Sequence, residues 1–198
     1  MTELHRRQLL TGSLKALLSV SLTSAGLPAL ADTGASAATI DLHQIQLERG
    51  DDGLQLSYRV VFDLPKDIED ALYKGVAVVF VAETTLLKRR WYWSDKQRNH
   101  ATRRWRLAYQ PLTRRWRLTQ DGLARQYNSL EDAMFMICRV NEWRIGDNVP
   151  AGEERDYYIE FSFRLDTDEL PRPMQIGLGI QSDWNIAVQR QINVSAAR

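Results

Sequence analysis

The sequence predicts a mostly β protein: a two-sheet antiparallel β-sandwich, immunoglobulin-like in outline, with two short helices. Three observations support this fold class. Segments that alternate apolar and polar residues recur along the chain, turn-forming residues separate them, and only two segments have helical spacing. Eight or nine strands at this spacing favour two packed sheets.

The first 31 residues are predicted to be an export signal. A basic start precedes a weakly apolar stretch at 16–27, and small residues follow it. Ala29 and Ala31 stand where a signal peptidase requires small side chains, so we expect cleavage before Asp32. The protein is therefore expected in the periplasm.

The sequence leaves the export route open. Arg6 and Arg7 before two leucines resemble a twin-arginine signal. His5 and Thr11 depart from that pattern, so the Sec route stays equally open. An uncleaved membrane anchor is the alternative, which Lys15 and the scattered hydroxyl groups disfavour.

The rest of the chain is predicted to be a flexible leader and one domain. Small and polar residues fill 32–38, and a single β-sandwich domain is expected over 39–198. Its one cysteine, Cys138, allows no internal disulfide. Without residues 1–31 the chain has 23 basic and 24 acidic residues, so the exported form is nearly neutral.

The domain is predicted to begin with a hairpin and a short helix. Segments 40–49 and 54–62 flank the turn residues 50–53, and the second segment alternates apolar with polar side chains. Apolar residues at helical spacing between Pro65 and Gly75 predict a helix of two turns.

The middle of the domain is predicted to be strands. The β-branched residues of 76–87 indicate a central strand, which we expect to continue through the aromatic residues as far as Trp93. A polar loop is expected at 94–99. Alternation at 104–109 and again at 115–118 predicts two further strands joined by a turn.

The C-terminal part is predicted to be one helix and several strands. Asn128 or Ser129 can cap a helix whose apolar residues recur with helical spacing up to Cys138. The remaining predicted strands are 142–145, which has the weakest pattern, 157–165, 175–180 and 184–194.

Motifs of known enzymes are not recognised in the sequence. After residue 31 the only histidines are His43 and His100, and neither stands in a catalytic motif. Cys138, on the apolar helix face, is interpreted as a core residue rather than a catalytic thiol. The carboxylates of 166–169 are interpreted as a solvated turn rather than a calcium site. We therefore predict that the protein is not an enzyme and that it has no catalytic residue, metal site or cofactor.

Charge is distributed unevenly. Residues 88–125 hold twelve basic and two acidic residues, so the remainder of the exported chain is acidic. Within this segment Arg-Arg-Trp-Arg-Leu occurs at 103–107 and again at 114–118. If both copies are strands of one hairpin, their Trp and Leu side chains share one face. The other face then carries the candidate anion-binding residues Arg104, Arg106, Arg115 and Arg117.

Two interpretations of this arginine face stay open. Acidic residues of the same domain, such as Glu153, Glu154, Asp156 and Glu160, or water alone, can neutralise it. Alternatively it binds a phosphorylated lipid headgroup, an acidic protein or another polyanion; nucleic acid is not expected for an exported protein. The six tryptophans are expected to be core anchors rather than a ligand platform.

Several motifs resemble one family. Arg-Trp-Tyr-Trp at 90–93 and Leu-Pro-Arg-Pro-Met-Gln at 170–175 are the most specific, with support from Leu64-Pro65 and the segment 125–133. Together they resemble the proteobacterial exported family catalogued as domain of unknown function 4390. The resemblance implies no activity, cofactor or catalytic residue. Its members are described as encoded beside a membrane-bound sensor kinase, which implies an envelope partner.

The expected function is a non-enzymatic binding or accessory module for a periplasmic or membrane partner, with a sensor kinase as one candidate. An enzyme of unrecognised type is one alternative. A structural protein bound to anionic lipid, in contact with the membrane surface, is the other. The sequence does not indicate the oligomeric state.

Overall fold

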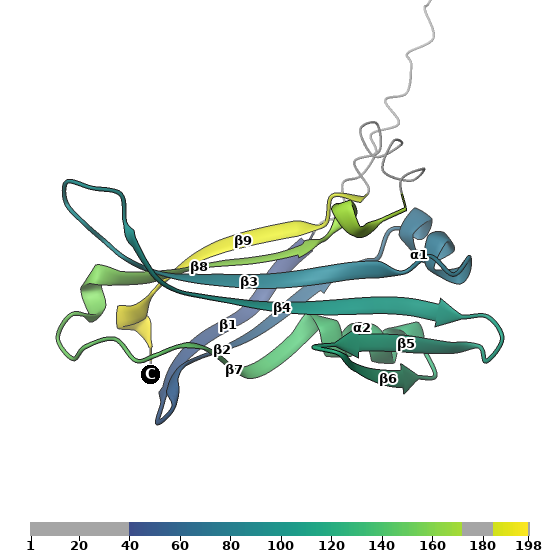
Figure 1. Cartoon of the computed structure of the whole chain (residues 1–198), viewed down its shortest axis with the longest axis horizontal. Helices are drawn as coiled ribbons and strands as arrows, with labels where there is room; N and C mark the ends of the chain where they lie inside the picture. Colours follow the sequence, from purple (N-terminus) through teal and green to yellow (C-terminus); the bar gives the residue numbers. More distant parts are fainter. Residues whose placement is uncertain (1–39, 172–183, 198) are drawn as a thin grey trace, which may run out of the picture. The chain divides into compact units, whose positions relative to one another are not determined.

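Two antiparallel sheets form the part of the chain that this computed structural model describes, residues 40–171 and 184–197 (Figure 1). One sheet has the strand order β1-β2-β7 and the other β6-β5-β4-β3-β8-β9. The strands are β1 (Ile40–Gly50), β2 (Gly53–Phe62), β3 (Val78–Lys88), β4 (Lys96–Gln110), β5 (Arg115–Gln120), β6 (Leu123–Tyr127), β7 (Arg139–Gly146), β8 (Tyr157–Leu165) and β9 (Ala187–Asn193). The predicted two-sheet class is confirmed.

The smaller sheet is built on the predicted N-terminal hairpin. β1 and β2 pair from Ile40 opposite Phe62 to Gly50 opposite Gly53. Gly53 has a φ of +126°, and a Cβ there would collide with the carbonyl group of Gly146 in β7. Only glycine therefore fits where the hairpin turn meets the neighbouring strand.

The larger sheet is centred on β3, which pairs with β4 on one side and β8 on the other. Residues 78–82 of β3 are buried without interruption, which explains the apolar, β-branched run in the sequence. β4 and β5 form the predicted hairpin, with Leu107 opposite Leu118. Its inward residues are core, since Trp105, Leu107, Trp116 and Leu118 are all buried.

The core lies between the two sheets. The Tyr58 ring of β2 packs against Phe161 of β8, with ring centroids 4.8 Å apart. Asn99 of β4 donates a hydrogen bond to the carbonyl oxygen of Ile145 in β7, which ties the sheets together at one edge. The inner face of the larger sheet is therefore apolar, and its opposite face, called the outer face below, is largely polar.

Two helices cover parts of this core. α1 (Lys66–Tyr73) follows Pro65, and its Ile68, Ala71 and Leu72 are buried. α2 (Leu130–Cys138) begins at Ser129, whose hydroxyl accepts a hydrogen bond of 3.0 Å from the backbone N–H of Asp132. Both helices lie where the sequence predicts them.

Some predicted boundaries are wrong. The strand expected to reach Trp93 ends at Lys88, and β4 begins within the expected loop, at Lys96. β6 was not predicted because it lacks apolar alternation, with residues 123–126 all exposed. The weak strand at 142–145 is part of the longer β7, and the last strand begins only at Ala187. The strand predicted at 175–180 lies outside the described residues.

Candidate functional site

The four candidate arginines lie on the outer face of the larger sheet. Three of them lie in the paired part of the β4–β5 hairpin. In the pairing of these two strands, Arg106 of β4 lies opposite Thr119, and Arg115 and Arg117 of β5 lie opposite Gln110 and Ala108. Arg104 of β4 pairs with Val81 of β3. Their side chains point away from the buried tryptophans and leucines of the same strands, because neighbouring residues of a strand face opposite sides.

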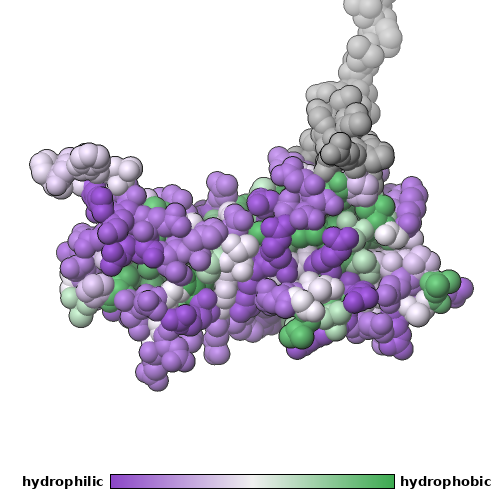
Figure 2. Space-filling model, in the orientation of Figure 1, coloured by the Kyte–Doolittle hydropathy of each residue, from purple (hydrophilic) through white to green (hydrophobic). Residues whose placement is uncertain are grey.

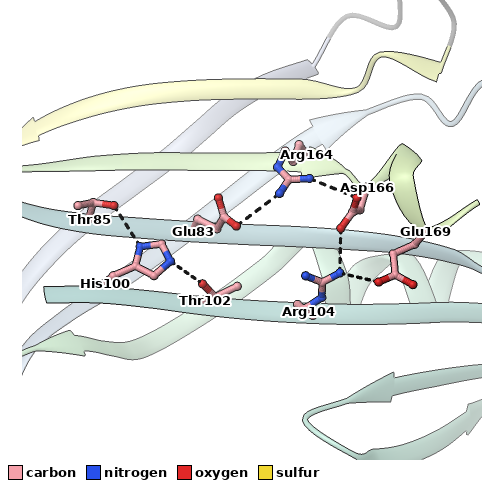
Figure 3. Close-up of polar contacts among 8 residues, drawn as sticks. All are labelled: Glu83, Thr85, His100, Thr102, Arg104, Arg164, Asp166 and Glu169. Atoms are coloured by element: carbon pink, nitrogen blue, oxygen red, sulfur yellow. Dashed lines mark hydrogen bonds and ion pairs between the residues drawn. The ribbon is translucent and has the colours of Figure 1, made fainter. Parts of the chain in front are cut away.

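Arg104 belongs to an internal ion-pair network (Figure 3). Its guanidinium group lies 2.8 Å from the carboxylate of Asp166 and 3.2 Å from that of Glu169. Asp166 is buried and lies 3.5 Å from Arg164, which in turn lies 3.4 Å from Glu83. For Arg104 this agrees with the interpretation that acidic residues of the same domain neutralise the arginine face, although Asp166 and Glu169 are not among the four examples named from the sequence.

The other three arginines differ from Arg104. Arg106, Arg115 and Arg117 are exposed. Within residues 40–171 and 184–197 none of them forms an ion pair with a carboxylate. Three cationic groups therefore remain available to an anion on this face.

The outer face also carries a shallow polar hollow of about 420 Å³ beside the network. Its lining residues come from β3, β8 and β9: Glu83, Thr85, Glu160, Phe161, Ser162, Gln189, Arg190 and Gln191. His100 lies at its margin, with Nδ1 3.2 Å from the hydroxyl of Thr85 and Nε2 3.0 Å from that of Thr102 (Figure 3). The imidazole is held between two hydroxyl groups.

The two histidines of the described residues, His43 and His100, lie on different sheets. His43 is on β1 of the smaller sheet and His100 on β4 of the larger one, so no histidine pair is assembled. Across the part of the chain that is described, no three His, Cys, Asp or Glu side chains gather to hold a metal ion. Cys138 packs partly into the core, and burial raises the pKa of its thiol to about 12.

The most unusual surface feature is the loop between β3 and β4, residues 89–95, called the aromatic loop below. Its tip consists of Trp91, Tyr92 and Trp93, which are 92%, 66% and 70% exposed. Figure 2 shows the loop standing out from the body of the protein, at the left in the orientation of Figure 1. The expectation that all six tryptophans are core anchors is wrong for Trp91 and Trp93, because the chain leaves the β3–β4 ladder before it reaches them.

The base of the aromatic loop is anchored through Asp95. This carboxylate accepts a hydrogen bond of 3.0 Å from the backbone N–H of Arg90 and one of 2.6 Å from the phenol of Tyr158 in β8. The bond from Tyr158, followed by the bond from Arg90, lowers the pKa of Asp95 below its ordinary value. The same bond to Asp95 raises the pKa of Tyr158 to about 12.

Arg89 and Lys88 fix the other side of the loop base. Arg89 donates to the carbonyl oxygen of Arg155 at 2.9 Å and to Asn193 Oδ1 at 2.7 Å, and its guanidinium group stacks over the Tyr158 ring. Lys88 Nζ lies 2.6 Å from Glu153, and this hydrogen bond raises the pKa of the amine. Two of the basic residues next to the tip are therefore structural.

One sequence signal could have identified the aromatic loop. Three consecutive aromatic residues cannot all lie on one face of a strand, since side chains alternate between faces. The turn-forming Ser94-Asp95 follows them directly. The predicted cleavage residues, Ala29 and Ala31, lie outside the described residues.

The fold and these surfaces define a two-sheet β-sandwich with an anchored, exposed aromatic loop and a basic outer face. The chain belongs to the family described as a domain of unknown function, DUF4390, whose model matches residues 37–193. The predicted family is thus confirmed. Neither the curated proteins nor the solved structures contain a match. Within the described residues, no helix has the length and apolarity needed to cross a membrane.

Proposed function

We propose that this chain is an exported, non-enzymatic binding module of the cell envelope, and that the aromatic loop is its binding surface. The observation that carries the proposal is the exposure of Trp91, Tyr92 and Trp93 together on a loop whose base is fixed by Asp95. The partner is a periplasmic or membrane component, with a membrane-bound sensor kinase among the candidates.

The exposure of these side chains supports binding. Soluble surfaces carry single exposed apolar residues, but a contiguous aromatic cluster is typical of an interaction site. Trp and Tyr are also the residues that contribute most often to binding energy. The anchored base of the loop also favours binding, because a preorganised loop loses less conformational freedom when it binds a partner.

The polar outer face supports binding over catalysis. Its ion pairs satisfy one another, and the hydroxyl of Thr85 next to His100 lies at a shallow, open hollow rather than in a deep pocket. An enzyme of unrecognised type would need a deeper pocket with converging polar groups.

Photo-cross-linking in living cells tests the proposal. A benzophenone amino acid replaces Tyr92 in one strain and Leu112 in a control strain. Leu112 is fully exposed in the β4–β5 turn, at the other end of β4. We expect adducts, protein or lipid, at Tyr92 well above those at Leu112. Equal yields at the two positions contradict the proposal.

A second candidate function is anion binding by the outer face, and Arg106, Arg115 and Arg117 favour it because none of them forms an ion pair with another described residue. Polyglutamate is a suitable acidic probe. The wild type should be retained on immobilised polyglutamate at low salt and released at high salt, because screening weakens exposed charge pairs. Replacing the three arginines with glutamine should abolish this retention. If the three substitutions leave the retention unchanged, the outer face is ruled out as the anion-binding surface.

A further inference from the structure

We propose that the tip of the aromatic loop inserts into the interfacial region of an anionic bilayer. This inference rests on the proposed function and specifies the partner as a lipid surface. It concerns Trp91, Tyr92 and Trp93 together with the free cations beside them. The outer face is a separate surface.

The tip side chains have the chemistry of a membrane interface. Tryptophan and tyrosine are enriched there because each has an apolar ring and one polar N–H or O–H group. Among the described residues, the rings of the tip make ring–ring contacts only with one another, with centroids 4.4 Å apart for Trp91 and Tyr92 and 6.5 Å apart for Tyr92 and Trp93. They are therefore available for insertion.

The charges beside the tip complement anionic headgroups. Arg90, Lys96 and Arg98 are exposed, and none forms an ion pair within residues 40–171 and 184–197. The one carboxylate of the loop, Asp95, accepts hydrogen bonds from Arg90 and Tyr158 at the loop base. Together Arg90, Lys96 and Arg98 outnumber the one carboxylate of this segment, Asp95, and basic residues next to a membrane favour anionic lipid.

The size of the tip favours a bilayer over a folded protein partner. Burying one aromatic side chain removes roughly 150–250 Å² from water, so three remove roughly 450–750 Å². A standard protein interface buries about 800 Å² on each partner, in a broad complementary patch. A small protruding tip falls below that area, whereas a fluid bilayer needs no complementary shape.

The loop base explains how the tip stays exposed. Arg89 is tied to Asp156 by a backbone hydrogen bond of 2.7 Å and to β9 through Asn193. Together with the bonds to Asp95, these contacts prevent the loop from folding back over the sheet. A hollow of about 930 Å³ lies between the tip, the two arginines of the loop and Asp156.

Vesicle binding by the protein purified after export tests the inference. Vesicles of phosphatidylcholine with about one third phosphatidylglycerol are compared with phosphatidylcholine alone, and the anionic vesicles should bind more tightly. Alanine at all three tip positions should weaken binding at least about tenfold. Leu112→Ala is the control and should bind like the wild type.

Brominated lipid shows where the rings lie. It should quench part of the tryptophan fluorescence of the wild type, because Trp91 and Trp93 enter the bilayer. The double variant Trp91→Phe with Trp93→Phe should still bind but lose this quenching, since the other four tryptophans are buried in the domain. Glutamine at Arg90, Lys96 and Arg98 should remove the preference for anionic vesicles.

Three results overturn the inference. These are a wild type that binds neither kind of vesicle, an alanine variant that binds as tightly as the wild type, and quenching that persists in the phenylalanine variant. If vesicle binding fails while Tyr92 still cross-links to a protein in cells, the bilayer is excluded and the proposed binding function stands. If Tyr92 cross-links to nothing, the proposed function itself fails.

Discussion

The phenol of Tyr158 and the carboxylate of Asp95 form a 2.6 Å hydrogen bond that joins β8 to the base of the aromatic loop. Asp95 also accepts a hydrogen bond from the backbone N–H of Arg90, so one side chain fixes both the start of the loop and its contact with the sheet. The exposed tip therefore extends from a rigid base.

Removing this hydrogen bond should change the titration of Asp95. The bond favours the charged carboxylate, so Tyr158→Phe should raise the pKa of Asp95 toward its ordinary value of 3.8. Carboxyl NMR titration of the wild type and the variant measures the change. An unchanged pKa in the variant would show that Tyr158 does not hold the carboxylate.

The pH dependence of the loop anchor follows from the same bond. Because folding lowers the pKa of Asp95, its contribution to stability is present above the unfolded-state pKa and is lost as the pH falls through the lower folded value. The loop base should therefore stay intact at pH 5 and loosen only in stronger acid. Amide exchange of Arg90 as a function of pH checks this, and loosening already near neutral pH would contradict it.

The two faces of the β4–β5 hairpin should respond differently to mutation. Trp105→Ala should lower the free energy of unfolding by about 3–5 kcal/mol, because the ring is buried. Glutamine at Arg106, Arg115 and Arg117 should change it by no more than about 0.5 kcal/mol, because these side chains are exposed and form no ion pair with a described carboxylate. Denaturant titration measures both effects.

Arg104 should behave unlike its three neighbours. Arg104→Gln removes the closest cationic partner of the buried Asp166, so we expect a loss of about 1–2 kcal/mol. The half-exposed position of Arg104 keeps the loss at the low end for a charged hydrogen bond. Equal stability of the Arg104 variant and the triple variant would contradict this distinction.

Cys138 should be structural and unreactive. Burial raises its pKa to about 12, so little thiolate forms at neutral pH. Native protein should react slowly with a thiol reagent, and Cys138→Ala should cost on the order of 1 kcal/mol while function survives. Rapid labelling of the folded protein, with loss of function in the variant, would instead indicate a reactive site.

Export processing should leave Asp32 as the first residue, because Ala29 and Ala31 precede the predicted cut. N-terminal sequencing of the exported protein measures this. Lysine at both Arg6 and Arg7 separates the two routes, because only a twin-arginine substrate should then fail to be exported. A protein that keeps Met1 to Ala31 and stays with the membrane would support an anchor.

Strong periodicity made much of the fold predictable. β2 and β8 alternate apolar and polar residues, and both were predicted with bounds within one residue of the observed ones. α2 was predicted from its apolar spacing and its Ser129 cap. In these segments local propensity and burial favour the same structure.

The candidate site was harder to predict, because its main features depend on contacts distant in sequence. Trp91 to Trp93 have high β propensity, which favoured an extended strand, yet Asp95 and Tyr158 fix a loop there. The ion pair of Arg104 with Asp166 joins residues 62 positions apart, so the repeat alone could not separate Arg104 from Arg106.

Occupation of the aromatic loop in the envelope is measured most directly by cysteine accessibility. Tyr92→Cys and, as a control, Leu112→Cys are each introduced with Cys138→Ala and treated with a membrane-impermeant maleimide, both as purified proteins and in cells with a permeabilised outer membrane. Both cysteines should react fast in the purified proteins. In cells, the cysteine at position 92 should be protected and the one at position 112 should react. Equal labelling of the two positions in cells would contradict a binding role for the loop.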